Sequence, residues 1–176
     1  LTSIKVTDNG CGMEPDDASC AFLRHATSKI KDESDLNSII TLGFRGEALA
    51  AIAAVSDVRI ISKTAEQSVG AMLEVSGGVT IGIGDRAAQN GTTVFVENLF
   101  ANVPARRKFL KKDMTEAMAV TAVVEKIALS HPEIAFRLIC DGNTRLETAG
   151  DGQLKSTVYA VFGREFTKAL IPVDSS

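Results

Sequence analysis

The stretch VRIISKTAEQSVGAMLEVSGGVTIGIGDRAAQNGTTVFVE, residues 58–97, decides the fold class. It contains four strand-like runs with no helical pattern between them: residues 58–62, 71–76, 79–83 and 92–97. The pair Gly77-Gly78 is typical of a hairpin turn, and the polar residues 85–91 predict a loop. Because the strands are grouped and do not alternate with helices, the sequence predicts an α+β two-layer α/β sandwich and not a doubly wound parallel sheet.

Upstream of this stretch, the sequence predicts a strand and two helices around a long polar connection. Residues 3–7 alternate and lead into a tight loop. Pro15, followed by two acidic residues, is typical of a helix start, and this helix is expected to reach about Arg24. A second helix is expected over residues 47–55. The polar residues 25–46 form a connection of a length that is usually functional.

Downstream, helical and strand-like patterns alternate. The predicted elements are, in order, a helix from residue 113 to the His131-Pro132 pair, strands over 135–140 and 145–148, a helix over 154–162 and a strand over 168–173. Asp113 and Glu116 have the acceptor-x-x-Glu spacing of a capping box at the first helix start. Asp141-Gly142-Asn143 predicts a hairpin between the two strands, and Gly163 is expected to close the second helix.

The composition is that of an ordinary globular chain. Of the 176 residues, 45% are hydrophobic and 23% charged, which excludes a disordered or collagen-like protein. The formal net charge of -3 does not indicate a globally basic nucleic-acid binder, so any DNA contact requires a local patch. No apolar run approaches the roughly 18 to 20 residues of a membrane helix. Three cysteines without a CxxC pair predict a reducing cytoplasm, and neither a disulfide framework nor a zinc site.

The segment Asp8-Asn9-Gly10-Cys11-Gly12 places a carboxylate at the end of a strand, followed by two glycines. A carboxylate can accept a hydrogen bond from an exocyclic amine such as that of adenine. Glycines let the backbone approach a planar ring closely, since they lack a Cβ atom. The same residues are also a common turn sequence. Taken alone, the motif leaves nucleotide binding and a plain turn open.

Two further motifs lie in and directly after the polar connection. The first, Thr27-Ser28-Lys29, places hydroxyl groups beside a lysine; the second, Gly43-Phe44-Arg45-Gly46-Glu47-Ala48-Leu49, places glycines and an arginine at a helix N-terminus. Free N–H groups and the helix dipole favour phosphate at such a place. The spacings of a Walker loop and of a dinucleotide fingerprint are both absent. Solvated loop charges explain the same residues, so both interpretations stay open at this point.

The segment after residues 92–97 carries a local basic patch despite the acidic total charge. Its five cations are Arg106, Arg107, Lys108, Lys111 and Lys112. Such a patch can neutralise DNA phosphates. A solvated helix start whose arginines pair with nearby acids is the alternative, and the sequence leaves it open.

In this order and at these separations, the motifs resemble the N-terminal ATPase region of the MutL family of DNA mismatch repair proteins. Residues 8–12 look like its adenine-binding motif, and residues 26–30 look like the start of its ATP lid. GFRGEAL, residues 43–49, looks like the phosphate-binding end of the lid. Residues 91–110, ending in NVPARRKFL, look like the last motif and the segment after it. GFRGEAL and PARRKFL together are specific, because related ATPases such as gyrase and the heat-shock chaperones carry different lid sequences.

The resemblance implies a fold and a role for each matching residue. The fold is a GHKL-type (Bergerat) ATP-binding domain, partial, over residues 1–150, followed over 151–176 by the beginning of a ribosomal protein S5-like domain. Asp8 would bond the adenine amine with support from Thr92, and Gly10 and Gly12 would let the ring approach. The lid would contain Thr27, Ser28 and Lys29. The phosphate-binding end of the lid would contain Gly43, and backbone N–H groups would be presented by Arg45, Gly46, Glu47, Ala48 and Leu49.

One departure from the family limits what this chain is expected to do. The family has, upstream of the adenine motif, a helix with a Glu that activates water and an Asn that holds magnesium, and this sequence starts after that point. No catalytic and no metal-binding residue is therefore assigned. We expect a fragment that is inactive by itself, from a parent that is a weak ATPase. The lysine that reaches the γ-phosphate is expected beyond Ser176.

The resemblance also implies partners and a compartment. The parent would use ATP and magnesium as a conformational switch, form a homodimer, and associate with DNA and with mismatch-recognition and strand-incision proteins in the bacterial cytosol, near the nucleoid. It would not associate with a membrane. A docking module for nucleic acid or protein, independent of nucleotide and using residues 106–112, is the alternative hypothesis. Steep salt dependence of DNA binding, without dependence on ATP, would favour that module.

Overall fold

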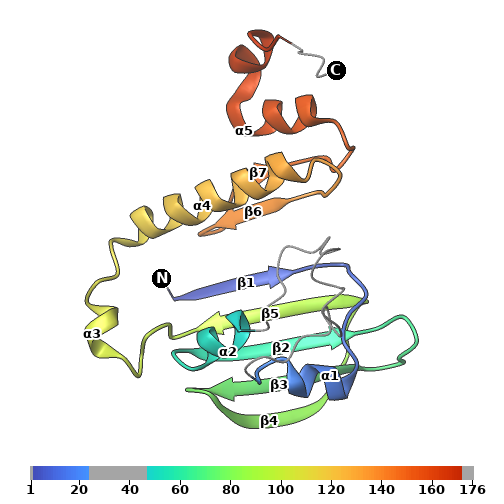
Figure 1. The fold of residues 1–176 in the computed structure, drawn as a ribbon, viewed down its shortest axis with the longest axis vertical. Helices are drawn as coiled ribbons and strands as arrows, with labels where there is room; N and C mark the ends of the chain where they lie inside the picture. The colour runs from blue at the N-terminus through green and yellow to red at the C-terminus, as the bar shows by residue number, and fades with distance from the viewer. Residues whose placement is uncertain (1, 24–46, 172–176) are drawn as a thin grey trace, which may run out of the picture. The chain divides into compact units, whose positions relative to one another are not determined.

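The computed structural model describes residues 2–23 and 47–171, and its ribbon is shown in Figure 1. The chain divides into two compact units, Leu1–Leu110 and Lys111–Ser176. The predicted boundary between residues 150 and 151 falls inside the second unit. The assignment of residues 151–176 to an S5-like domain stays a prediction.

The first unit is built on a five-stranded sheet of order β1-β5-β2-β3-β4, in which every neighbouring pair is antiparallel. Its strands are β1 Ser3–Thr7, β2 Asp57–Lys63, β3 Gly70–Ser76, β4 Val79–Arg86 and β5 Gly91–Glu97. All five predicted strands are confirmed. β4 continues into the predicted loop, because Asp85 and Arg86 still pair with β3. An antiparallel sheet combined with helices confirms the α+β prediction.

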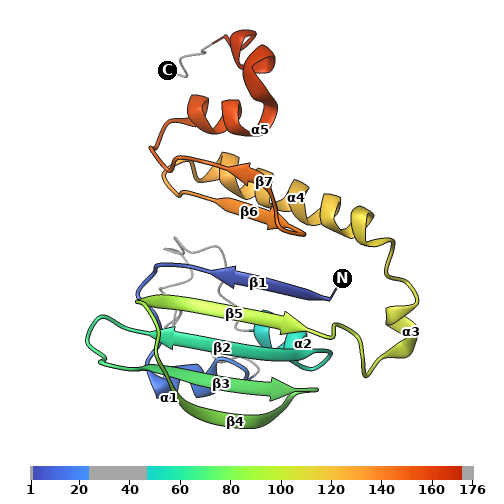
Figure 2. The same ribbon diagram turned by 180° about the vertical axis from the view of Figure 1, so that it is seen from behind.

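Two short helices cover one face of this sheet, as Figures 1 and 2 show from opposite sides. They are α1 Pro15–Cys20 and α2 Ala48–Ala53. Alternate residues of a strand point to the same face, so one set of β2 and β3 side chains turns toward the helices. The buried core there consists of Ala53, Val58, Ile60, Leu73 and Val75. The core therefore lies between the helices and the central strands.

Helix α1 is shorter than predicted, since it ends at Cys20 and not near Arg24. The N–H of Ala21 donates to the carbonyl of Ala18 at 3.2 Å, which is the three-residue spacing of a tightened last turn. The turn between β3 and β4 agrees with the prediction. Gly77 and Gly78 both have positive φ, 55° and 84°, as a two-residue type I′ hairpin requires.

The end of the sheet where β2 begins is tied to the loop that follows β5. The carboxylate of Asp57 accepts from the Ser76 hydroxyl at 2.6 Å and from the Asn98 amide at 2.7 Å. These two hydrogen bonds, that from Ser76 first, lower the pKa of the Asp57 carboxyl below its ordinary value. The Asn102 amide donates to the carbonyl of Ala54 at 2.8 Å, which fixes the same loop to the end of α2. The loop then leads into the short helix α3, Pro104–Arg107.

The second unit packs two helices on a two-stranded hairpin. Its elements are α4 Asp113–Ser130, β6 Arg137–Cys140, β7 Asn143–Glu147 and α5 Leu154–Lys168. The predicted hairpin is confirmed, with positive φ at Asp141 and Gly142 in a two-residue turn. Its most buried apolar side chains are Ala128 of α4, Leu146 of β7 and Val158 of α5. None of the helices in the described ranges is long and apolar enough to cross a membrane.

Two predictions for this unit were wrong, those of the capping box and of the last strand. The residue that caps α4 is Lys112 and not Asp113, and the Glu116 carboxylate accepts from the backbone N–H of Lys111 at 2.8 Å, so the capping box does not form. Gly163 closes the helix that begins at Leu154, as predicted, because its φ of 79° and ψ of -179° are not helical; a further helical stretch then runs to Lys168. The strand expected over 168–173 is absent from its described part, which ends at Ile171. An apolar run this short is ambiguous between helix and strand.

Candidate nucleotide-binding site

The carboxylate of Asp8 is held in place by backbone groups where β1 ends beside the start of β5. Its Oδ1 atom accepts from the N–H of Gly10 at 2.9 Å and from the N–H of Thr92 at 3.2 Å. The N–H of Asp8 in turn donates to the carbonyl of Thr92 at 2.9 Å. Oδ2 accepts from no side chain or N–H group in the described ranges, and the residue is exposed. The structure thus presents an oriented acceptor oxygen that can receive a ligand N–H.

Two glycines bring this loop against its neighbours without a side chain between them. Gly12 has a φ of +75°, and a Cβ there would lie 2.1 Å from the carbonyl oxygen of Lys63. Gly91 has a φ of +111°, and a Cβ there would lie 2.2 Å from the carbonyl oxygen of Asp8. Both positions therefore require glycine for close approach of one backbone to another. The predicted approach of a nucleotide ring to Gly10 and Gly12 stays a prediction.

Ser62 joins the three segments of the site, and sequence reasoning missed it. It is fully buried, with 0% of its surface exposed, on the strand β2 that lies beside β5. Its Oγ accepts from the N–H of Met13 at 2.8 Å and donates to the carbonyl of Gly91 at 3.2 Å. It also lies 2.9 Å from Oγ1 of Thr92. The sequence does contain a signal for this role. Ser62 continues the alternation of the buried residues Val58 and Ile60, and a buried hydroxyl needs hydrogen-bond partners.

The residues predicted for the lid fall only partly within the described structure. Thr27, Ser28, Lys29, Gly43, Arg45 and Gly46 lie outside the described residues. Glu47 caps α2, Ala48 is its first residue, and the side chain of Leu49 packs against the core. The first N–H groups of a helix, here those of Ala48 and Leu49, have no intrahelical partner. Their contact with phosphate stays a prediction.

The predicted basic patch is exposed but is divided between the two units. Arg106, Arg107 and Lys108 belong to the first unit, and Lys111 and Lys112 to the second. The Arg106 guanidinium lies 5.9 Å from the centre of the Phe100 ring. The Glu116 carboxylate accepts from the backbone N–H of Lys111 at 2.8 Å, and the pairing of the arginines with nearby acids stays open.

The described part of the site offers recognition by hydrogen bonds and no evident metal centre. In residues 2–23 and 47–171, no group of three or more His, Cys, Asp or Glu side chains is placed to hold a metal ion. The groups around Asp8 are one carboxylate, two hydroxyls and several backbone N–H and C=O groups. Their chemistry is suited to reading the edge of a base.

Curated proteins similar to this chain are DNA mismatch repair proteins named MutL. The chain is 46% identical over 173 residues to MutL of Agathobacter rectalis, covering 98% of this chain and 27% of that protein. It is 49% identical over 168 residues to MutL of Caldanaerobacter subterraneus subsp. tengcongensis, covering 96% of this chain and 28% of that protein. The chain thus spans little more than a quarter of the length of these relatives. A search of protein-family models found no match.

Solved structures with the same fold include MutL ATPase domains. The Aquifex aeolicus MutL ATPase domain complexed with ADP superimposes with a TM-score of 0.73 at 32% identity, covering 92% of this chain and 57% of that chain. The N-terminal domain of a DNA repair protein superimposes with a TM-score of 0.72 at 29% identity, covering 92% of this chain and 48% of that one. Sequence and fold agree, and we conclude that these 176 residues belong to the MutL family of DNA mismatch repair proteins.

Proposed function

We propose that this chain supplies the adenine-recognising part of an ATP-binding domain, within a mismatch repair protein that uses ATP as a conformational switch. The observation that supports this best is the geometry at Asp8. One carboxylate oxygen is fixed by the N–H groups of Gly10 and Thr92, and the other is exposed to accept from a ligand. A related MutL ATPase domain has been solved in complex with ADP.

The residues around Asp8 fit the base of an adenine nucleotide. The adenine amine would donate to Oδ2 of Asp8, with the Thr92 hydroxyl supporting this contact directly or through a water molecule. The resemblance further assigns Thr27, Ser28 and Lys29 to the lid. The same resemblance assigns the phosphates to the segment that contains Gly43, Arg45, Gly46, Glu47, Ala48 and Leu49.

We assign no residue of this chain to magnesium or to the activation of water. In the family, these roles belong to a Glu and an Asn that precede the adenine motif. Bound ATP with magnesium would supply a reactive γ-phosphoryl group, and this chain would contribute binding and orientation. We therefore propose that hydrolysis and the homodimer require a longer polypeptide, which works with DNA and repair proteins in the cytoplasm.

Calorimetry with a non-hydrolysable ATP analogue and magnesium tests the proposal. It compares this chain with a longer polypeptide that restores the helix expected before Leu1. The longer form should bind, Asp8→Ala should abolish binding, and this chain should bind weakly at best. The control is Asp17→Asn on α1, an exposed acid that makes no hydrogen bond in the proposed site. If the folded longer form does not bind, the nucleotide assignment is wrong.

A second candidate function, docking of nucleic acid, is favoured by one observation. The five basic side chains of residues 106–112 are exposed. Contact with DNA phosphates would make binding fall steeply with salt. Replacing Lys108 and Lys111 with Gln should then reduce the salt dependence by about one phosphate contact each. DNA binding that does not change when ATP is added would favour the docking module over the ATP switch.

A further inference from the structure

The hydroxyl groups of Ser62 and Thr92 form a short chain, and the backbone N–H of the same Thr92 donates to the carboxylate of Asp8. Ser62 is fully buried, whereas Thr92 is only partly buried. Their oxygen atoms lie 2.9 Å apart, so one of the two hydroxyls donates to the other. Which one donates decides what Thr92 offers to a ligand, because a hydroxyl has a single proton.

The surroundings of Ser62 decide the direction of this hydrogen bond. The Ser62 oxygen already accepts from the N–H of Met13 at 2.8 Å. The carbonyl oxygen of Gly91, 3.2 Å from Oγ of Ser62, carries no proton and can only accept. The Ser62 proton is therefore used on Gly91, and the Thr92 hydroxyl donates to Ser62. Two accepted bonds and one donated bond then saturate the Ser62 hydroxyl.

We infer that Ser62 is a positioning residue for base selectivity, which it exerts through Thr92. By drawing the Thr92 proton into the protein, Ser62 leaves only lone pairs of Thr92 facing the ligand. Together with Oδ2 of Asp8, the site then offers two acceptors and no hydroxyl donor to the base edge. The exocyclic amine of adenine supplies protons to such a site, whereas the O6 carbonyl of guanine meets lone pairs. The inference rests on the proposed adenine site and deepens it.

Removing the Ser62 hydroxyl should increase affinity for the wrong base. In Ser62→Ala the Thr92 hydroxyl has no inward acceptor, so it rotates freely and can donate to guanine O6. We expect affinity for a GTP analogue to rise about tenfold, while affinity for the ATP analogue changes by less than about threefold, of the size of one gained hydrogen bond. A serine with a purely structural role would lower both affinities, since disorder does not create a new contact.

Ser56→Ala is the matched control. Ser56 is also buried, 4% exposed, and its hydroxyl donates to the carbonyl of Ile52 at 2.6 Å, at the opposite end of β2 from Ser62. This variant should lose thermal stability as Ser62→Ala does but keep the wild-type ratio of the two affinities. A change in that ratio for Ser56→Ala would show that lost stability alone alters selectivity, and would overturn the inference.

Thr92→Val provides a second variant at a partly exposed position, which is expected to fold even if Ser62→Ala does not. It removes the hydroxyl while keeping the shape of the side chain. The ratio of the affinity for the ATP analogue to that for the GTP analogue should therefore fall by a factor similar to that in Ser62→Ala. In the double variant Ser62→Ala/Thr92→Val, the gain in GTP affinity should disappear, because Ser62 acts through Thr92. Independent, additive effects of the two substitutions would overturn the inference.

The affinities are measured by calorimetry on the longest polypeptide that carries these residues, with non-hydrolysable ATP and GTP analogues. A wild-type protein that prefers the ATP analogue, with an unchanged ratio in folded Ser62→Ala, would overturn this inference and leave the proposed function intact. A wild-type protein that binds neither analogue would overturn the proposed function and the inference with it. A rise in GTP affinity confined to Ser62→Ala would establish the role of Ser62.

Discussion

Gly12 and Gly152 have almost the same backbone conformation in very different surroundings. Their φ values are +75° and +74°, but a Cβ on Gly12 would lie 2.1 Å from the Lys63 carbonyl oxygen, whereas a Cβ on Gly152 would meet nothing within 4 Å. Comparing alanine at these two positions separates the cost of a positive φ from the cost of a clash. It therefore measures how tightly the Asp8–Gly12 loop is packed on β2.

We expect Gly12→Ala to lower the free energy of unfolding by about 3 kcal/mol, as the sum of a left-handed conformation and an overpacked contact. Gly152→Ala should cost only about 1 kcal/mol, from the conformation alone. Urea denaturation followed by circular dichroism measures both. Equal losses in the two variants would show that the loop moves away from β2 at little cost and is not tightly packed on it.

The carboxylate of Asp8 can be tested separately from the backbone that holds it. Asp8→Asn keeps an oxygen for the N–H groups of Gly10 and Thr92 but removes the negative charge and one acceptor. We expect affinity for an adenine nucleotide to fall by about 10-fold to 100-fold, the size of one charge-assisted hydrogen bond. Fluorescence titration with a labelled ATP analogue is the measurement. An unchanged affinity would show that the Asp8 carboxylate does not contact the nucleotide.

At the scale of single residues, the sequence pointed to the groups that we propose a ligand meets, but not to the group that holds them in place. Asp8 and Thr92 stand in motifs, where residue type and spacing indicate a role. Ser62 stands in an ordinary strand, and its importance comes from being buried beside β5 and Met13. That burial depends on which face of the sheet the helices cover, and no local pattern contains this information.

Among the elements, the start of β2 contains a hydrogen-bonded carboxylate that should make stability depend on pH. The folded-state pKa of Asp57 is lowered, chiefly by the Ser76 hydroxyl and then by the Asn98 amide. The stability that the Asp57 carboxylate contributes is therefore fully present above the pKa of this group in the unfolded chain, near 3.8. It is lost as the pH falls through the lower pKa of the folded state. Acidification should weaken the attachment of the loop after β5.

The variant Asp57→Asn tests this contribution. At pH 7 it should lower the free energy of unfolding by about 1 kcal/mol, because an amide nitrogen cannot accept from Asn98. Below about pH 4 the difference from wild type should shrink, since the wild-type carboxyl becomes protonated while the amide does not titrate. Urea unfolding at pH 7 and pH 3 measures the difference, with Asp85→Asn on β4 as control. A difference that is the same at both pH values contradicts the account.

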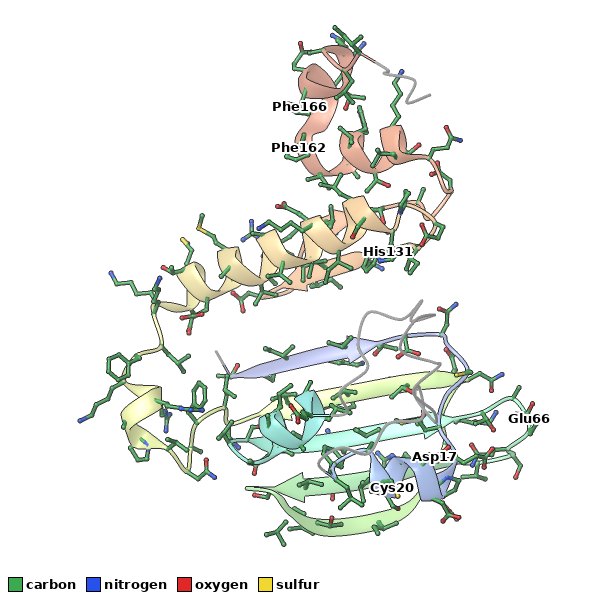
Figure 3. All side chains as sticks on the ribbon, viewed as in Figure 1. Asp17, Cys20, Glu66, His131, Phe162 and Phe166 are labelled. Carbon is green, nitrogen blue, oxygen red and sulfur yellow. The ribbon has the colours of Figure 1, made fainter. Side chains whose placement is uncertain are left out.

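The kink in α5 is a second prediction at the scale of elements. Gly163 has φ 79° and ψ -179°, a combination that is essentially restricted to glycine. Across the kink, the rings of Phe162 and Phe166 lie 4.7 Å apart between centroids, and Figure 3 labels both. Gly163→Ala should destabilise the second unit by about 1–3 kcal/mol. Greater helicity with no loss of stability, by circular dichroism, would instead mean that α5 prefers to be straight.

Element predictions succeeded where a local pattern has one interpretation and failed where it has two. Alternation identified β1, strand-like runs identified β2, β3, β4 and β5, and the pairs Gly77-Gly78 and Asp141-Gly142 marked both hairpin turns, where the structure has positive φ. Residues 168–171 are apolar enough for a strand, but Lys168 belongs to the end of α5, which the kink at Gly163 had concealed. The capping box failed because its spacing matched while the helix began one residue away from the expected position.

For the whole molecule, the motifs identified the family, whereas the division into units came only from the structure. The units separate between Leu110 and Lys111, inside the basic segment, where neither glycine nor a change of composition marks a boundary. Contacts between residues distant in sequence define such a boundary, so a reading along the chain does not locate it. The resemblance to ATPase motifs depended on short contiguous segments, and it was confirmed by relatives over nearly the whole chain.

The central claim is that the Asp8 loop and the start of β5 recognise an adenine base. Nuclear magnetic resonance titration of the isotope-labelled chain with ADP tests it most directly, because chemical shifts report even millimolar binding. We predict saturable shifts of the Gly10 and Thr92 amide signals with ADP, much smaller shifts with GDP, and none at Gly142 or Gly152 in the second unit. Equal responses to ADP and GDP, or shifts that leave Gly10 and Thr92 unchanged, would contradict the account.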